Sequence, residues 1–276
     1  KTVSNKQVDE RFWKPEVDAS GNGYAVIRFL PAPDGETVPW AKVYSHAFQG
    51  PGGWYIENSL TTIGDKDPVG EVNRRLWNSG EDADKDTARK QKRKLSYYSN
   101  IYVVKDPKHP ENEGKVFLYK YGKKIHDKIL AAMQPEFQDE TPVNVFDLWE
   151  GANFKLKIKK VAGFWNYDSS EFDSISALSA DDTELEATWK SEHSLEAFTA
   201  ADQFKSYEDL EKRLNLVLGS APRPTAPSVD SEEYEPVAAP QSDFRAKMSA
   251  PTPVKQEAVV EDDDALSYFA SLASDD

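Results

Sequence analysis

The 276-residue chain contains no cysteine, only two methionines and only four histidines. The absence of cysteine excludes disulfide scaffolds, thiol catalysis and cysteine-ligated zinc. No apolar run approaches the ~18 residues that a membrane-spanning helix needs, and no signal-peptide pattern opens the chain, so no membrane partner is expected. Neither the P-loop pattern nor the glycine pattern of dinucleotide-binding folds occurs, which leaves nucleotide hydrolysis without support.

Charge is unevenly distributed along this acidic chain. The sequence has 34 basic and 48 acidic residues, a net charge of -14, but 12 acidic and three basic residues lie from Asp230 onward. Residues 220–260 are rich in proline and alanine without apolar periodicity, which predicts a disordered linker. Residues 261–276 form an acidic tail around a few apolar side chains. The folded core is therefore expected at 11–219, with only a small charge excess.

Strand signals dominate the first two thirds of that core. The strand-like runs are Tyr24–Pro31, Trp40–Gln49, Trp54–Ser59, Leu95–Val104, Lys115–Tyr121 and Asn153–Asn166. Helices are expected within Glu81–Lys94, at Gly122–Met133 and after the capping pattern that begins at Ser206 and stops at Gly219. Short strands with interspersed helices predict a mainly β (α+β) fold, a small Greek-key barrel with additions.

The stretch Arg89–Lys128 combines 12 basic residues and four acidic ones with six aromatic residues. Single-stranded nucleic acid binds to such mixtures, because cations follow the phosphates and aromatic rings stack on the bases. The alternative is a sheet with aromatic side chains in its core and solvated lysines outside. A second aromatic cluster, Phe164–Tyr167, follows the basic run Lys155–Lys160 and favours the binding interpretation.

Enzymatic chemistry finds little support. Asp168–Asp209 holds 12 acidic residues and two lysines, but neighbouring carboxylates point apart and no nucleophile or metal-ligand spacing accompanies them. The four histidines lie far apart in sequence and outside any metal motif. We therefore predict a protein that is not an enzyme.

Several blocks in order resemble the single-stranded DNA-binding proteins of T-even-type bacteriophages. They are Gly23–Pro31, Lys92–Ile101, Val103–Pro107, Pro110–Phe117, Tyr121–Ile125, Trp149–Phe154 and Gly163–Asp168. The resemblance implies a five-stranded OB-fold barrel with a subdomain inserted at about 40–95, C-terminal helices and a disordered acidic tail. It also implies DNA binding in a basic, aromatic-lined cleft.

Matching positions give the residues that this resemblance assigns to the cleft. The cations are Arg28, Lys92, Arg93, Lys94, Lys120 and Lys123, and the aromatic residues are Tyr97, Tyr119, Phe164 and Tyr167. Lys120 is an arginine in the usual pattern, a change that keeps the charge but loses the planar fork. Two usual tyrosine positions are Lys66 and Ala88 here, a loss for which Tyr98 or Trp77 could compensate.

The family's structural zinc is held by one histidine and three cysteines. His46 remains, but the cysteine positions fall at Ser59, Val69 and Val72, none of which supplies a thiolate. No zinc and no other cofactor is therefore expected. A small apolar core with Ile63, Leu76 and Trp77 is predicted in its place.

The chain ends carry the expected protein contacts. Residues 1–10 correspond to a shortened N-terminal arm, the segment that the family uses for self-association along DNA. The tail is expected to bind phage replication and recombination proteins in the cytoplasm of the infected bacterium. The residues predicted to do so are Asp262, Asp263, Asp264, Leu266, Tyr268, Phe269 and Leu272.

The leading interpretation is a protein that coats and protects single-stranded DNA in phage replication, recombination and repair. Two alternatives remain open at this point. One is an RNA-binding, translational-regulatory OB-fold protein that uses the same cleft. The other is an acidic scaffold that binds proteins only.

Overall fold

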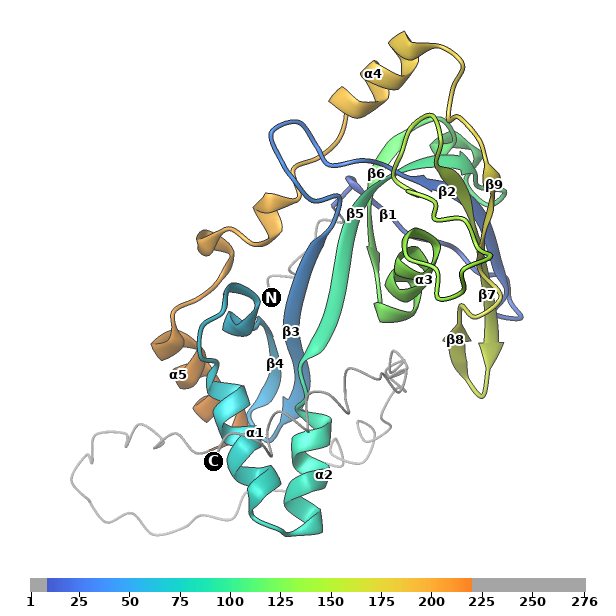
Figure 1. Cartoon of the computed structure of the whole chain (residues 1–276). Coiled ribbons are helices and arrows are strands. Elements are labelled where there is room, and N and C mark those ends of the chain that lie inside the picture. Colours follow the sequence, from blue (N-terminus) through green and yellow to red (C-terminus); the bar gives the residue numbers. More distant parts are fainter. Residues whose placement is uncertain (1–8, 220–276) are drawn as a thin grey trace, which may run out of the picture.

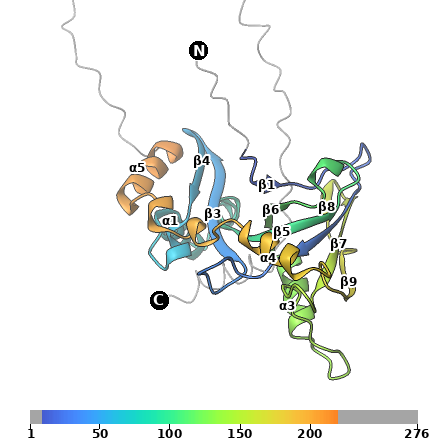
Figure 2. The same cartoon turned by 90° about the horizontal axis from the view of Figure 1, so that it is seen from above.

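The computed structural model describes residues 9–219, which form a mixed α+β fold with a large sheet and five α-helices (Figures 1 and 2). The strands are β1 (Phe12–Trp13), β2 (Gly23–Phe29), β3 (Ala41–Gly50), β4 (Gly53–Asn58), β5 (Lys94–Lys105), β6 (Val116–Tyr121), β7 (Ala152–Val161), β8 (Phe164–Asn166) and β9 (Glu171–Ile175). The α-helices are α1 (Pro68–Asn78), α2 (Asp82–Lys90), α3 (Lys123–Met133), α4 (Asp182–Lys190) and α5 (Tyr207–Leu218). The expected α+β class is confirmed.

The long strand β5 connects two lobes of the molecule. Its first half pairs with β3, from Ser45↔Lys94 to Ala41↔Tyr98, and its second half pairs with β2. From Tyr97 to Tyr102 it also pairs with β6, and β2 continues the sheet to β7. We call the part around β1, β2, β6–β9 and α3 the sheet lobe, and the part around β4, α1, α2 and α5 the helical lobe (Figure 1).

The sheet lobe encloses the larger apolar core. Alternate residues of its strands point inward, so Ile27, Phe29, Ile101, Phe154 and Leu156 are completely buried. Burial of side chains of this size stabilises a fold by roughly 1.5–3 kcal/mol each. This core fixes the strands that position the surface described below.

The helical lobe has its own core, and α5 completes it. Leu210 and Leu214 of α5 are buried against Phe48, Tyr55 and Val69. Val69, at one of the former cysteine positions, is therefore part of an apolar core, and Val72 at another packs against it.

The partners expected for that small core are wrong. Ile63 is exposed, and Leu76 and Trp77 are only partly buried and lie outside the core cluster. The apolar surface of the lobe is covered instead by a helix about 140 residues later in the chain.

The ends of a helix are predicted correctly where the sequence carries capping residues. Ser206 caps α5 by accepting a hydrogen bond from the backbone N–H of Asp209, and Gly219 ends it with a φ of 73°. Helices α2 and α3 also lie within their predicted ranges. Helices α1 and α4 were not expected, although Asp67 and Asp181 cap them in the usual way.

The run Asn153–Asn166, expected as one strand, is a hairpin. Ala162 and Gly163 both have positive φ, 51° and 88°, which reverses the chain between β7 and β8. Two consecutive residues with positive φ are typical of the tight turns that join antiparallel strands. The sequence did not predict this turn because its first position is Ala162, whereas such turns usually have Asn, Asp or Gly there.

Candidate nucleic-acid interface

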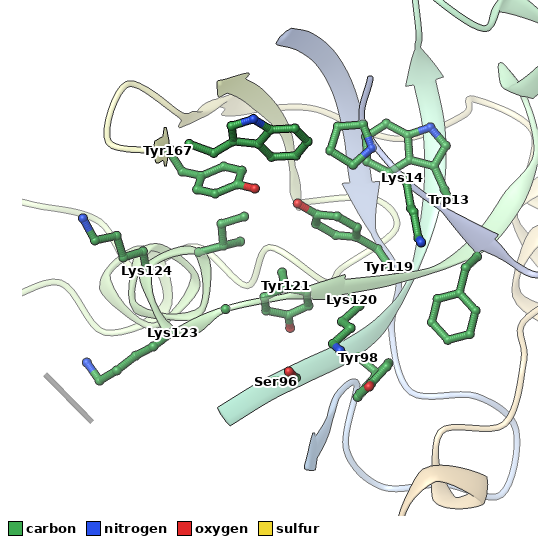
Figure 3. Close-up of a pocket in the computed structure, with 15 residues that line it drawn as sticks. Trp13, Lys14, Ser96, Tyr98, Tyr119, Lys120, Tyr121, Lys123, Lys124 and Tyr167 are labelled. Carbon is green, nitrogen blue, oxygen red and sulfur yellow. The ribbon is translucent and has the colours of Figure 1, made fainter. Parts of the chain in front are cut away.

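A groove of about 600 Å³ lies at the edge of the sheet lobe, where β1, β6 and α3 meet (Figure 3). It is lined by Phe12, Trp13, Lys14, Pro15, Ser96, Tyr98, Tyr119, Lys120, Tyr121, Gly122, Lys123, Lys124, Ile125, Trp165 and Tyr167. These lining residues include four lysines and no carboxylate, although the whole chain has more acidic than basic residues. The groove is a locally electropositive surface on an acidic protein.

The groove exists because β1 leaves the sheet early. β1 pairs with β6 in parallel only at Phe12↔Leu118 and Trp13↔Tyr119. Pro15, two residues later, has no N–H with which to continue the ladder. Strand β6 continues to Tyr121 and is followed by α3, so its last residues border the groove.

The four lysines surround the groove from three elements. Lys14 follows β1, Lys120 lies on β6, and Lys123 and Lys124 extend from the start of α3 (Figure 3). Lys123 Nζ lies 2.7 Å from Asp127 Oδ2, and Lys124 Nζ lies 3.3 Å from Asp168 Oδ1. Such solvent-exposed pairs contribute only about 0–1 kcal/mol, so a phosphate can compete for these ammonium groups.

The carboxylate of Asp168 remains charged beside these lysines. A hydrogen bond from the Asn166 side chain lowers its pKa most, and Lys124 lowers it further. Lys128 Nζ also donates to the Asp168 carbonyl oxygen, at 3.0 Å. These contacts tie the segment after β8 to α3 at one end of the groove.

Aromatic side chains form the floor and the walls. Tyr119 and Tyr121 are almost completely buried, and burial raises the pKa of each phenol, so both stay neutral. Tyr98 is partly exposed on a wall, with its ring stacked on Phe198 at 4.3 Å between centroids. Tyr167 approaches Tyr119 from the opposite side (Figure 3).

The structure brings five of the predicted cleft residues to this groove: Tyr98, Tyr119, Lys120, Lys123 and Tyr167. Lys120 and Tyr98 face each other across the β5–β6 pair, and the Lys120 Nζ lies 5.8 Å from the centre of the Tyr98 ring. A cation beside a partly exposed ring is a combination that single-stranded nucleic acid can bind.

Arg28 is a correction. Its side chain is completely buried rather than exposed in the cleft, and its guanidinium donates to the carbonyl oxygens of Asp147 and Ser176 and to Asn153 Oδ1. Burial lowers its pKa. Arg28 therefore holds two loops against β2 and is not among the residues that line the groove.

Tyr97 and Phe164 also lie outside the groove lining. Tyr97 points into the core of the sheet lobe, where its ring stacks on His126 at 3.8 Å. Tyr97 therefore fits the alternative given from the sequence, in which the aromatic side chains of the sheet lie in its core. Phe164 is exposed, 45%, near the tip of the β7–β8 hairpin, but is not among the lining residues.

The predicted basic cluster Lys92, Arg93 and Lys94 lies at the start of β5, outside the groove lining. The Arg93 guanidinium packs 3.9 Å from the centre of the Tyr44 ring. Lys94 is exposed and shares one face of β5 with the groove residues Ser96 and Tyr98, because alternate residues of a strand point the same way. This face leads from the cluster into the groove.

Four further groove residues were not predicted for the site: Trp13, Lys14, Lys124 and Trp165. Lys124 lies within the basic stretch Arg89–Lys128, and Trp165 lies within the aromatic cluster Phe164–Tyr167, so each carried a signal in the sequence. Lys14 has no such signal, and only the fold brings it to the groove.

The side chains at the family's zinc positions do not suit a metal. His46 Nδ1 lies 3.1 Å from the Gln91 carbonyl oxygen, and His46 Nε2 lies 3.2 Å from Asp67 Oδ1, so both ring nitrogens face protein groups. Ser59 and Val69 are buried nearby without offering a thiolate or imidazole. Within residues 9–219 no group of three or more His, Cys, Asp or Glu side chains is arranged to hold a metal ion.

No helix of the described chain is long and apolar enough to cross a membrane. The sequence profile of a family described as "gp32 DNA binding protein like" matches residues 21–218. This match spans both lobes and every lining residue of the groove except the β1 segment.

Individual proteins give the same result. The chain is 43% identical over 233 residues to the single-stranded DNA-binding protein of Enterobacteria phage T2, covering 83% of this chain and 77% of that protein. It is 42% identical, with the same coverage, to the single-stranded DNA-binding protein of Enterobacteria phage T4. A protein of the same description from Escherichia phage SV14 is 49% identical over 59 residues, which is 21% of this chain and 52% of that protein.

Proposed function

Because this chain belongs to the gp32-like family of DNA-binding proteins, we propose that it coats and protects single-stranded DNA during phage replication, recombination and repair. It is a single-stranded DNA-binding protein and not an enzyme. The observation that carries the proposal is the groove with four lysines, several aromatic side chains of which Tyr98 is partly exposed and Trp165 exposed, and no lining carboxylate.

The chemistry of the groove favours an unpaired strand. Lysines neutralise phosphates and release their counterions, a gain that any nucleic acid provides. Aromatic rings add about 1–3 kcal/mol for each stacked base, a gain available only when the base is not paired inside a duplex. Tyr98 beside Lys120 supplies both contributions at one place.

We further propose that the sheet lobe is an OB-type barrel and that the segment at about 40–95 is a subdomain inserted into it. The supporting observation is that β3 and β5 run from the sheet lobe to the helical lobe, so that the chain between them returns to the same sheet. Lys94 on this path would extend the DNA track from the groove toward the helical lobe.

We also propose that the protein works without zinc or another cofactor. The close contact between His46 Nε2 and Asp67 Oδ1, at 3.2 Å, occupies the place of a metal ligand set in the helical lobe.

The contacts with other proteins are proposals on segments outside the described residues. We propose that the acidic tail, 261–276, binds phage replication and recombination proteins, and that residues 1–10 take part in self-association along DNA. The proposed compartment is the cytoplasm of the infected bacterium.

The test is titration of the full-length protein with oligo-dT at two salt concentrations. Lys120→Ala removes one groove cation, so affinity should fall and the slope of log affinity against log salt should shrink by roughly 0.7. The same change is expected for Lys94→Ala if the track continues along β5. Tyr98→Leu should weaken binding with little change of the slope, because stacking releases no counterions.

The matched control is Lys212→Ala, which removes an exposed lysine from α5 on the other lobe and should change neither quantity. No detectable binding of oligo-dT by the parent protein would contradict the proposed function and favour a protein-binding scaffold. Tighter binding of an RNA oligomer of equal length would favour the RNA-binding alternative.

A further inference from the structure

The β7–β8 hairpin projects from the sheet lobe (Figure 1). Strand β7 pairs with β2 as far as Gly23↔Ile158, and its last three residues pair with β8. Strand β8 has no other partner strand within residues 9–219. The tip is therefore held by its own ladder and by the side chains at its base, rather than by the core of the lobe.

The two aromatic residues near the tip face different surroundings. Phe164 is paired with Val161, and Trp165 is paired with Lys160. Successive residues of a strand point to opposite faces, and it is Trp165, together with Tyr167, that lines the groove. Phe164 is left on the face away from it.

Trp165 also differs from the other rings of the groove in what it touches. Tyr119 and Tyr121 stack within the core, and Tyr98 stacks on Phe198. The Trp165 indole is 40% exposed, and none of the ring contacts seen among residues 9–219 involves it. This exposed indole face lies in the same groove as four lysines, so it is available to stack on a base whose phosphates the lysines bind.

We propose that Trp165 is a base-stacking residue that closes the groove from the hairpin side, opposite the wall formed by Tyr98 and Lys120. This inference rests on the proposed function and deepens it: the ligand is an unpaired base, held between two walls of the groove. Phe164, the residue that the family resemblance selects, does not contact the DNA.

The experiment compares full-length variants by titration with oligo-dT. Trp165→Leu removes the aromatic face and keeps an apolar side chain, so affinity should fall about 5- to 100-fold with an unchanged salt slope. Trp165→Phe should recover most of this loss, since a smaller ring can still stack. Phe164→Leu should leave affinity within about twofold of the parent.

Trp54→Leu is the matched control, because Trp54 is similarly exposed, 47%, but lies on β4 in the helical lobe. Tryptophan fluorescence gives a second readout: quenching by oligo-dT should decrease in Trp165→Phe and persist in Trp54→Phe. If the parent binds and Trp165→Leu binds equally well, the inference is wrong while the proposed function stands. A larger loss in Phe164→Leu than in Trp165→Leu would also overturn it.

Discussion

At the scale of single residues, His126 shows how the floor of the groove is built. It lies one turn into α3, with its ring parallel to Tyr97 at 3.8 Å and edge-on to Trp40 at 5.1 Å. Burial lowers the pKa of His126 to about 4, and the positive charges of Lys42 and Lys123 act in the same direction. The negative charge of Asp127 opposes the shift without reversing it. The imidazole is therefore a neutral aromatic spacer at neutral pH.

This spacer makes stability depend on pH. The unfolded chain takes up a proton on this imidazole near its ordinary pKa of 6.5, whereas the folded chain does so only near pH 4. Stability is therefore present in full above pH 6.5 and falls as the pH is lowered between these values, by up to about 3 kcal/mol. His126→Phe should lose less stability between pH 7 and pH 4 than the parent in urea denaturation.

His109→Gln is the control for this measurement. His109 is exposed, and hydrogen bonds to Glu16 and Glu111 raise its pKa, so its removal cannot reduce the loss below pH 6.5. Equal pH dependence of His126→Phe and the parent would show that another group dominates.

A second residue-scale prediction concerns the polar link of the helical lobe. Asp67 is buried; burial alone would raise its pKa, but hydrogen bonding and charge from His46, with the N–H of Leu60, lower it overall. The same carboxylate caps α1 through the N–H groups of Val69 and Gly70. It thus links β3 to the start of α1.

We predict that EDTA leaves the melting temperature unchanged, whereas Asp67→Ala lowers stability by about 3–5 kcal/mol, because it leaves buried His46 without its partner. Calorimetry of the parent with and without EDTA, and of the variant, measures both effects. About one zinc per chain by elemental analysis would contradict the proposal that the lobe needs no metal.

Residue identities alone could predict only part of this site. Lys120 and Tyr98 lie in the basic, aromatic stretch Arg89–Lys128, whereas Arg28 was placed in the cleft only by the family resemblance. Arg28 lies on β2 between the buried residues Ile27 and Phe29, and its guanidinium donates to carbonyl groups 119 and 148 residues later in the chain. Such long-range hydrogen bonds leave no local trace in the sequence.

At the scale of elements, the docking of α5 depends on a close backbone approach. The Gly52 N–H donates to the Val217 carbonyl oxygen at 2.7 Å, and a Cβ built on Gly52 would lie 1.9 Å from the Leu216 carbonyl oxygen. Only glycine permits the β3–β4 turn to touch the end of α5 in this way. The contact closes the core of the helical lobe.

Gly52→Ala should therefore push α5 away and destabilise the protein by about 1–3 kcal/mol. Affinity for oligo-dT should stay near that of the parent, because the groove lies in the other lobe. Gly70→Ala is the control: its Cβ would meet only the Asp67 Cβ at 4.0 Å, and alanine favours the helix. Thermal unfolding and limited proteolysis near Gly219 measure the effect; equal melting of Gly52→Ala and the parent would contradict it.

Elements with explicit end signals could be predicted, and those defined by tertiary contacts could not. Ser206 and Gly219 mark α5 because capping is a local interaction. The turn at Ala162 was missed because an alanine with positive φ is rare and is held there by the β7–β8 ladder. The packing of α5 on the helical lobe was equally invisible, since it joins segments far apart in the chain.

At the scale of the whole molecule, charge is divided between two parts of the chain. From Asp230 onward the sequence carries 12 acidic and three basic residues, while the described fold presents a groove with four lysines and no lining carboxylate. A carboxylate of this acidic segment and a DNA phosphate would compete for the same ammonium groups. Such competition depends on ionic strength, because the Debye length falls from about 30 Å at 0.01 M salt to about 10 Å at 0.1 M.

Removal of residues 261–276 should therefore tighten binding of oligo-dT severalfold at 10 mM salt and change it little at 200 mM salt. The physical reason is that the five Asp and one Glu removed can no longer occupy the groove in competition with phosphates.

The control is the full-length protein with Asp262, Asp263 and Asp264 replaced by Asn, which keeps the length and the apolar side chains. If charge is the cause, this variant should show about half of the gain in oligo-dT affinity at 10 mM salt. If it binds like the parent while the truncated protein binds more tightly, the apolar side chains of the tail are responsible instead: Leu266, Tyr268, Phe269 and Leu272. Equal affinities of the full-length and truncated proteins at 10 mM salt would exclude the competition. The role left to test for residues 261–276 would then be the binding of partner proteins, which the truncated protein should no longer capture.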